Sequence, residues 1–506
     1  MDDSIIKNLK YTFLCHILSN ILKFVQRMVF VQILSVEYVG LNNFLSNVIS
    51  VLSLTEFGLG SAIIYSLYNP LAKNDCNKIS YIINMTKKIY YFLAVMVIIL
   101  GLILLPFVIR FIKDGISDDF YLYYMLFLIN TSVSYLFSHK RMLLIADCKT
   151  YLVNIYSSLV QTLILILQIV SLYLASSYTI FLLLMIMGTI FENYLISQKV
   201  DNNYVLKVDK YITLDKIDKA EIINEVKNNI KSIFLHRLGV ILLSSNNNIV
   251  ISNYLGLTYV GLYNNYYLVF TMICLLSGKI LEALRSNIGR LLIYSKDDGK
   301  KIYQNVEFYI AWYSLYIGVG IYVCIDKFIC TWFGSQYVLA DNFACAIAVY
   351  CYLQNMRYGI LVVKEACGLY GEDKYKDLLE SIVNIVLAVL LIQNYGIIGV
   401  MYSNILSTLL VSFWVEPYVV FKNLKFSGCI NYYKNYIFYF AITVFISIVT
   451  KYVCKSIIEN NRIVDFFLEI ALCLCITTIL WIIIFYKNKI LRSFLQYVFL
   501  RRKTIN

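Results

Sequence analysis

The chain has 506 residues, of which 60% are apolar and 15% are charged. Soluble domains contain roughly 45–50% apolar and about 25% charged residues, so this composition excludes secreted enzymes, cytoplasmic enzymes and nucleic-acid-binding proteins. The net charge of +13 would suit a polyanion partner, but basic residues also set the orientation of membrane proteins. The sequence therefore predicts an all-α polytopic membrane protein.

A membrane-spanning helix needs about 20 mostly apolar residues. About fourteen segments meet this requirement, and the first, second and seventh of them carry unusually many polar residues. They lie near 11–33, 41–67, 88–109, 120–145, 151–175, 178–198, 232–253, 260–280, 303–325, 338–362, 377–393, 396–420, 432–455 and 463–487.

The basic residues are distributed unevenly between the two sides of the predicted spans. With the N-terminus in the cytoplasm, 34 of the 44 Lys and Arg residues lie in inner segments, 6 in outer segments and 4 within spans. This asymmetry predicts that both termini are cytoplasmic. The 13 Cys residues form no CxxC pair, so the sequence predicts neither a metal site nor another cofactor.

The sequence contains an internal repeat. A shift of 221 positions aligns 13–41 with 234–262 and places Tyr-Val-Gly-Leu at 38–41 on Tyr-Val-Gly-Leu at 259–262. The repeated unit holds six spans, so both copies enter the membrane in the same direction. This pattern predicts two six-helix bundles related by a pseudo-two-fold axis along the membrane normal, with a substrate path between them.

The repeat divides the chain into four parts. These are an N-terminal six-helix bundle (1–198), a cytoplasmic linker (199–231), a C-terminal six-helix bundle (232–421), and two extra spans with a basic tail (422–506). Apolar residues spaced among the basic residues of the linker favour an amphipathic helix on the inner membrane surface. A solvated linker without such a helix is the alternative.

The first span carries an unusual polar face. His16, Asn20, Lys23 and Arg27 follow one another at spacings of 4, 3 and 4, which places them on one side of a helix. An ionisable residue within a span costs roughly 2.5–3.5 kcal/mol on insertion scales, so it usually faces a cavity or a partner. We therefore predict a cationic cavity. Alternatively, the cations reach the headgroups or pair with Glu56.

The second copy of the repeat and the second span extend this predicted cavity. The shift of 221 maps His16 onto Arg237, Lys23 onto Ser244 and Arg27 onto Asn248, so the second copy is mostly polar where the first is cationic. Asn47 and Glu56 of the second span extend the predicted lining, although Glu56 is offset from the face that carries Asn47. Arg and Lys suit phosphate, whereas amides hydrogen-bond sugar hydroxyls. The predicted ligand is an amphiphile with an anionic phosphate, a glycan and a lipid tail.

Three other charged residues lie in or near the spans. Arg357 is read as an interfacial anchor or a ligand. Glu192 and Glu416 are candidate proton or sodium sites, although both lie near predicted membrane boundaries.

Several runs resemble bacterial polysaccharide transporters of the O-antigen and capsule flippase type. They are Tyr-Val-Gly-Leu-Asn-Asn at 38–43, Leu-Ser-Leu-Thr-Glu-Phe-Gly-Leu-Gly-Ser-Ala at 52–62, Tyr-Ser-Leu-Tyr-Asn-Pro-Leu at 65–71 and the second-half run 254–265. The resemblance places the chain with the multidrug/oligosaccharidyl-lipid/polysaccharide exporters of the bacterial cytoplasmic membrane. It implies that undecaprenyl-diphosphate-linked oligosaccharide is flipped from the inner to the outer leaflet, with the diphosphate held by Lys23, Arg27 and Arg237.

The resemblance also sets the expected partners and the alternatives. The expected partners are the lipid-linked oligosaccharide, membrane lipids and the polysaccharide polymerase machinery, for a protein that acts as a monomer and binds no nucleic acid. The alternatives are a multidrug exporter of the same superfamily and a membrane polysaccharide polymerase or glycosyltransferase. Cations in the first span argue against the first alternative. The short predicted outer loops argue against the second.

Overall fold

The computed structural model describes residue 19, residues 21–493 and residue 496, apart from 57–58, 112–118, 148, 205–213, 295–298, 368, 370–371, 374, 425–427 and 458–462. The described residues are almost entirely helical and contain no strand. They divide into two compact units, Met1–Gly261 and Leu262–Asn506. The all-α polytopic architecture predicted from composition is confirmed, whereas the bundle limits at 198 and 232 stay a prediction.

The first unit begins with a helix at 21–34 and a second span that is broken. The second span consists of α2 (Val36–Leu52), a 3₁₀ turn η1 (Ser53–Glu56) and α3 (Leu59–Ala72). The sequence predicted one continuous helix at 41–67, and this expectation is wrong. Hydrophobicity alone does not reveal such a break, because 3₁₀ turns are common at helix ends and contain no obligatory Gly or Pro.

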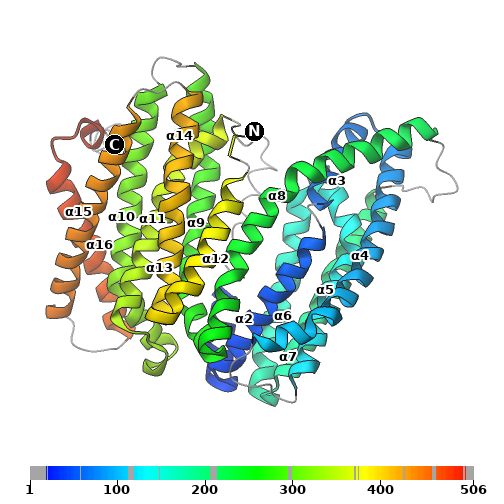
Figure 1. Ribbon diagram of the computed structural model, residues 1–506, viewed down its shortest axis with the longest axis horizontal. Coiled ribbons are helices and arrows are strands. Elements are labelled where there is room, and N and C mark those ends of the chain that lie inside the picture. Colours follow the sequence, from blue (N-terminus) through cyan, green and yellow to red (C-terminus); the bar gives the residue numbers. More distant parts are fainter. Residues whose placement is uncertain are drawn as a thin grey trace, which may run out of the picture. The chain divides into compact units, whose positions relative to one another are not determined.

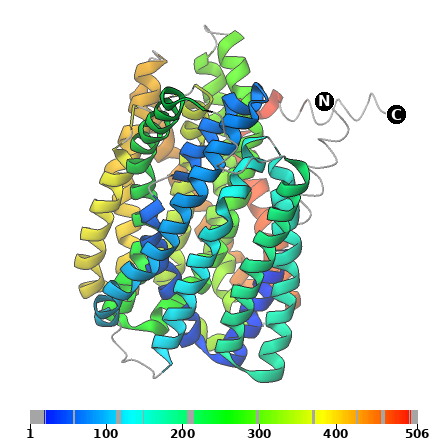
Figure 2. The same ribbon diagram turned by 90° about the vertical axis from the view of Figure 1, so that its right-hand side faces the viewer.

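Four long helices follow the second span in the first unit. They are α4 (Cys76–Arg110), α5 (Phe120–Ala146), α6 (Thr150–Ala175) and α7 (Tyr178–Asn203). Figures 1 and 2 show them as neighbours, with α5 packed against both α4 and α7. Hydroxyl groups join α5 to α4, because Tyr124 donates to the Gly101 carbonyl at 2.7 Å and Ser132 donates to the Ala94 carbonyl at 3.1 Å.

The predicted linker helix is continuous with the seventh span. Both belong to α8 (Lys216–Leu255), which crosses the ends of α3 and α4 and then turns to run beside α2 (Figure 1). Asp218 pairs with Lys78 of α4 at 2.9 Å, and the Lys219 ammonium lies 5.7 Å from the Tyr81 ring. Ile222 and Val226 are buried. The start of α8 is therefore amphipathic, with its apolar side packed on the protein.

The short turn before α2 recurs before α9 (Leu257–Tyr294) in nearly the same backbone conformation. Ser35 has φ 89° and ψ 164°, and Gly256 has φ 98° and ψ 172°. These residues are 221 positions apart, which is the spacing of the sequence repeat. The backbone therefore repeats where the sequence repeats.

The backbone conformation of Ser35, with φ 89° and ψ 164°, is essentially restricted to glycine. The backbone at Ser35 is therefore strained. We expect Ser35→Gly to raise the free energy of unfolding by about 1–2 kcal/mol, since such residues cost of order 1–3 kcal/mol. Thermal unfolding of the purified protein measures the change. The reciprocal variant Gly256→Ser should lower stability. A loss of stability in Ser35→Gly would contradict the argument.

The second unit contains the rest of α9 and the further α-helices that follow it in the chain. They are α10 (Gly299–Trp332), α11 (Asp341–Ala366), α12 (Lys376–Tyr395), α13 (Ile397–Ser407), α14 (Phe413–Asn423), α15 (Cys429–Ile457) and α16 (Ile463–Phe485). A single 3₁₀ turn, η4 (Ser335–Tyr337), precedes α11. A π-helical segment, η5 (Thr408–Ser412), joins α13 to α14 within the predicted twelfth span.

The two C-terminal helices belong to the core of this unit. Trp481 of α16 is fully buried and stacks on Trp312 of α10, with ring centroids 6.3 Å apart and an interplanar angle of 4°. Phe485 lies 4.2 Å from Trp481, centroid to centroid. Tyr432 and Tyr436 of α15 join the same apolar cluster. Aromatic packing therefore fixes α15 and α16 to α10.

Each predicted span has a helix at its position, but the helices differ in length and in hydropathy. Among the described residues, 10 helical stretches are long and apolar enough to cross one. The other four predicted spans correspond to the helix at 21–34, to α2 with α3, to α8 and to α11. Three of these four are the spans in which the sequence shows unusually many polar residues.

Candidate functional site

The helix at 21–34 has one face toward the protein and one face away from it. Ile21 and Val25 are 55% and 37% exposed, whereas Phe30 is buried. Phe30 packs against the Tyr178 and Phe181 rings of α7, at centroid distances of 5.7 and 4.9 Å. Gln26 donates to the Gln168 side-chain oxygen of α6 at 2.9 Å.

Lys23 and Arg27 lie on the opposite side of this helix from Ile21 and Val25, one turn apart. Both side chains are partly buried. Among the described residues, no carboxylate forms an ion pair with Lys23. The two cations therefore share a face, as predicted, and this face points away from the exposed apolar side. Their role in a cavity stays a prediction.

Glu56 occupies the break between α2 and α3. Its Oε1 accepts a hydrogen bond from the Tyr90 hydroxyl at 2.6 Å and from the Gly60 backbone N–H at 3.3 Å. The first N–H groups of a helix lack partners within the helix, so this carboxylate satisfies one of those at the start of α3. Glu56 thus stabilises the broken span and links it to α4.

Polar residues line the contact between α2 and α8. Ser50 and Ser245 are joined by a hydrogen bond of 2.6 Å between their hydroxyl oxygens. Asn47 donates from its side-chain amide to the Asn43 carbonyl of the previous turn at 2.7 Å, a local hydrogen bond within α2. Asn248 is buried in α8. Asn47 and Asn248 thus lie on two helices that are in contact.

The side chains of the remaining four predicted site residues lie outside the described part of the structure. His16 and Asn20 lie outside the described residues. Arg237 and Ser244 lie in α8, but their side chains lie outside the described part of the chain. The role of Arg237 in holding a diphosphate together with Lys23 and Arg27 therefore stays a prediction.

A buried ionic network occupies the second unit. The Arg357 guanidinium of α11 binds both carboxylate oxygens of Glu416 in α14, with Nη2 to Oε1 at 2.6 Å and Nε to Oε2 at 3.1 Å. The Lys376 ammonium at the start of α12 also donates to Glu416 Oε1, at 2.6 Å. Glu416 is fully buried. Two cations from two helices thus converge on one carboxylate.

A second carboxylate, Glu380, extends this network to the π-helical segment. Glu380 Oε1 accepts from the Thr408 hydroxyl at 2.8 Å and lies 3.7 Å from Arg357 Nη1, while Oε2 accepts from the Ser412 hydroxyl. Thr408 and Ser412 are the first and last residues of η5. One carboxylate therefore binds both ends of the π-helical segment, which is a rare structure that often occurs at functional sites.

Sequence reasoning found only part of this network. It singled out Arg357 and Glu416 separately, as an anchor or ligand and as an ion site, and it did not single out Lys376 or Glu380. The available signal was the presence of opposite charges in three successive predicted spans, since intramembrane charges usually pair with one another. The partners could not be assigned without the helix packing.

Glu192, the other candidate proton or sodium site, has partners within the first unit. It pairs with the Arg141 guanidinium of α5, and its Oε1 accepts from the Ser157 hydroxyl of α6 at 2.6 Å. Glu192 therefore joins three helices, α5, α6 and α7.

The helical fold of this chain is similar to the folds of solved membrane transporters. The structure is similar to that of the lipid II flippase MurJ in an inward closed conformation, with a TM-score of 0.68, 14% identity, and coverage of 94% of this chain and 99% of that chain. An inward-facing multidrug resistance MATE transporter matches with a TM-score of 0.63, 12% identity, and coverage of 81% and 96%. A Vibrio cholerae MATE transporter matches at 0.54, with 13% identity and coverage of 84% and 98%. No protein-family model and no curated protein sequence matches the chain.

Proposed function

We propose that the protein is a flippase, which moves an undecaprenyl-diphosphate-linked oligosaccharide from the inner to the outer leaflet of a bacterial cytoplasmic membrane. The oligosaccharide is a repeat unit of an O-antigen, a capsule or an exopolysaccharide. The observation that carries the proposal is the similarity of fold to a lipid II flippase, which extends over nearly the whole of both chains.

Two observations favour a lipid-linked substrate over a drug. The multidrug transporters match a smaller share of this chain than the lipid flippase does. In addition, Lys23 and Arg27 share the protein-facing side of the first helix. A cationic surface attracts a diphosphate and repels the cationic compounds for which a multidrug exporter would need an anionic cavity.

The proposed mechanism is alternating access. The inward-open state admits the lipid-linked glycan, and the cations bind its diphosphate while amide side chains hydrogen-bond the sugars. Rearrangement of the helix bundles then exposes the headgroup on the outer side, and the lipid tail remains in the bilayer throughout. No covalent chemistry is required, so the protein is proposed to be a transporter rather than an enzyme.

The main prediction concerns the two cations. A hydrogen bond to a charged group contributes about 1.5–3 kcal/mol. We therefore expect Lys23→Ala or Arg27→Ala to reduce flipping about ten- to a hundredfold at limiting substrate. The measurement is transfer of a fluorescent lipid-linked oligosaccharide between leaflets of proteoliposomes. Lys73→Ala, an exposed cation between α3 and α4, serves as the control.

Complementation in cells gives a second measurement. Deletion should leave lipid-linked oligosaccharide in the inner leaflet, and the wild-type protein should relieve this accumulation. If Lys23→Ala and Arg27→Ala relieve it fully, the cationic site is wrong while the fold stands. Elongation or release of the glycan by the purified protein would instead favour a polymerase or glycosyltransferase, and efflux of cationic dyes would favour a multidrug exporter.

A further inference from the structure

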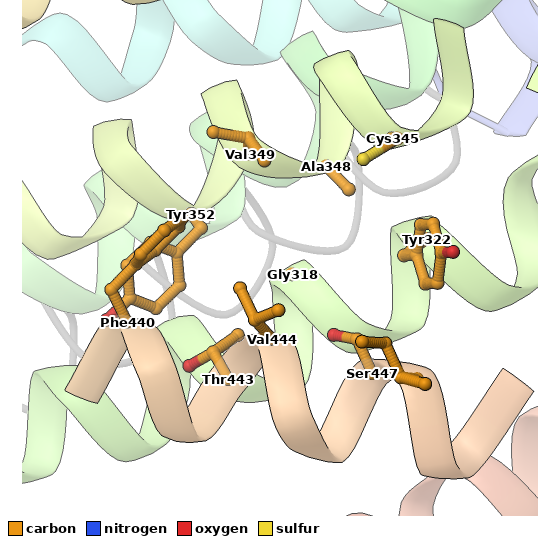
Figure 3. A pocket seen from close by; sticks show the side chains of 11 residues that line it. Gly318, Tyr322, Cys345, Ala348, Val349, Tyr352, Phe440, Thr443, Val444 and Ser447 are labelled. Atoms are coloured by element: carbon orange, nitrogen blue, oxygen red, sulfur yellow. The ribbon is translucent and has the colours of Figure 1, made fainter. Parts of the chain in front are cut away.

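A small apolar cavity of about 170 Å³ lies in the second unit, between α10, α11 and α15. Figure 3 shows Tyr352 and Phe440 at one end, Tyr322 and Ser447 at the other, and Gly318 between them. Every side chain that borders it belongs to one of these three helices. Gly318 contributes no side chain at the centre, where a methyl group would lie 3.4 Å from side-chain atoms of Thr443 and Tyr352.

The cavity opens to the outside of the unit. Two residues of α15 that border it, Val444 and Ile448, are 40% and 59% exposed. Both α10 and α15 are apolar and long enough to cross a membrane. In a bilayer these exposed side chains face hydrocarbon, so the cavity between them is accessible to lipid chains and not to water.

The size of the cavity suits one hydrocarbon chain. Sites for drug-sized ligands have volumes of roughly 300–1,000 Å³. This cavity is smaller and elongated, with aromatic rings at both ends (Figure 3). A glycan or a drug with several rings would not fit in it.

A positive charge marks one end of the cavity. The Lys451 ammonium lies 4.4 Å from the centroid of the Tyr322 ring, which borders the cavity. Lys451 follows Ser447 by one turn of α15, on the same side of the helix. Nearby, the Glu469 carboxylate lies 3.7 Å from the Lys327 ammonium. Among the described residues, no carboxylate lies within ion-pair distance of Lys451.

We propose that this cavity binds one acyl chain of an anionic glycerophospholipid, with Lys451 bound to the phosphate. Val444 and Lys451 are seven residues apart, which is roughly 10 Å along the helix. The chain therefore starts in the cavity and the phosphate lies at the level of Lys451. The lipid fills the gap between α15 and the α10–α11 pair. This site shares no residue with the proposed cationic site of the first helix and does not depend on the proposed function.

Photolabelling of the full-length protein in vesicles tests the proposal. Phosphatidylglycerol with a diazirine in one acyl chain is compared with phosphatidylcholine carrying the same chain, and labelled peptides are mapped by mass spectrometry. We expect labelling of α10, α11 and α15 around the cavity, with a preference of about tenfold for phosphatidylglycerol from one charge-assisted contact.

Two pairs of variants separate the chain site from the phosphate contact. Val444→Trp fills the cavity and should remove the label, whereas Phe445→Trp, at the neighbouring lipid-exposed position outside the cavity, should keep it. Lys451→Gln should remove the preference for the anionic lipid while the chain still labels the cavity. Lys455→Gln, an exposed cation one turn further along α15, should leave it unchanged.

Three results would overturn the proposal. They are equal labelling by the two lipids in the wild-type protein, labelling that Val444→Trp leaves unchanged, and displacement of the label by an isoprenyl phosphate but not by unlabelled phosphatidylglycerol. If the Val444→Trp variant fails to fold, the comparison of Lys451→Gln with Lys455→Gln still tests the phosphate contact. Both lysines lie near the C-terminal end of α15, where a substitution disturbs the fold less.

Discussion

Replacement of Glu416 by Ala should be among the most destabilising single changes in the protein. The substitution leaves Arg357 and Lys376 buried beside one another without their shared counter-charge. Breaking a buried ion pair by removal of one partner costs about 3–5 kcal/mol, because the remaining charge stays desolvated. Thermal unfolding in detergent, followed by circular dichroism, measures the loss.

A matched control separates burial from charge. Asp201 pairs with Lys140 at 2.6 Å, but its side chain is 55% exposed. Pairs of this kind contribute about 0–1 kcal/mol, so Asp201→Ala should have little effect. A quadruple variant with apolar residues at 357, 376 and 416 and with Gln at 380, so that no buried carboxylate loses its cation, should recover much of the stability lost in Glu416→Ala, since buried ion pairs can often be replaced by apolar residues of similar volume. Equal effects of Glu416→Ala and Asp201→Ala would contradict the argument.

The fold was largely predictable because the membrane imposes a strong pattern. A helix must satisfy its own backbone hydrogen bonds in hydrocarbon, so apolar runs of about 20 residues identify spans directly. What the pattern does not encode is a local departure from the α-helix. The 3₁₀ turn η1 and the π-helical segment η5 both lie inside apolar runs. Glu56 and Glu380 stabilise them through contacts with other helices, which depend on packing.

The candidate site was likewise predictable only where a single helix determines the geometry. The helical spacing of Lys23 and Arg27 was enough to place both on one face, because that inference needs only the geometry of a single helix. The grouping of Arg357 with Lys376 and Glu416 depends on how the three helices α11, α12 and α14 pack against one another. Charge alone indicated that an intramembrane residue such as Arg357 or Glu416 faces a cavity or a partner, but not which partner, and the role of Glu416 as an ion site stays a prediction.

The contact between the starts of α2 and α9 leads to the second large prediction. A methyl group at Gly40 would lie 1.9 Å from the Leu257 carbonyl oxygen, and one at Gly261 would lie 2.3 Å from the Val36 carbonyl oxygen. These are backbone atoms, which cannot turn aside as a side chain can. We therefore expect Gly40→Ala and Gly261→Ala each to cost at least 1–3 kcal/mol, about the typical cost of overpacking. Thermal unfolding measures both.

The two glycines should also be coupled. Gly40 and Gly261 are 221 positions apart, as are Val36 and Leu257, so each repeat places its glycine against the carbonyl of the other. Separating the two helix starts relieves both clashes at once. The double variant should therefore lose less stability than the sum of the two single variants, as expected for residues in one contact. Gly320→Ala is the control, because a methyl group there meets no atom within 4 Å and Ala favours the helix by about 1 kcal/mol. Strict additivity, or equal losses in all three single variants, would show that the close approach of these two helices does not determine their stability.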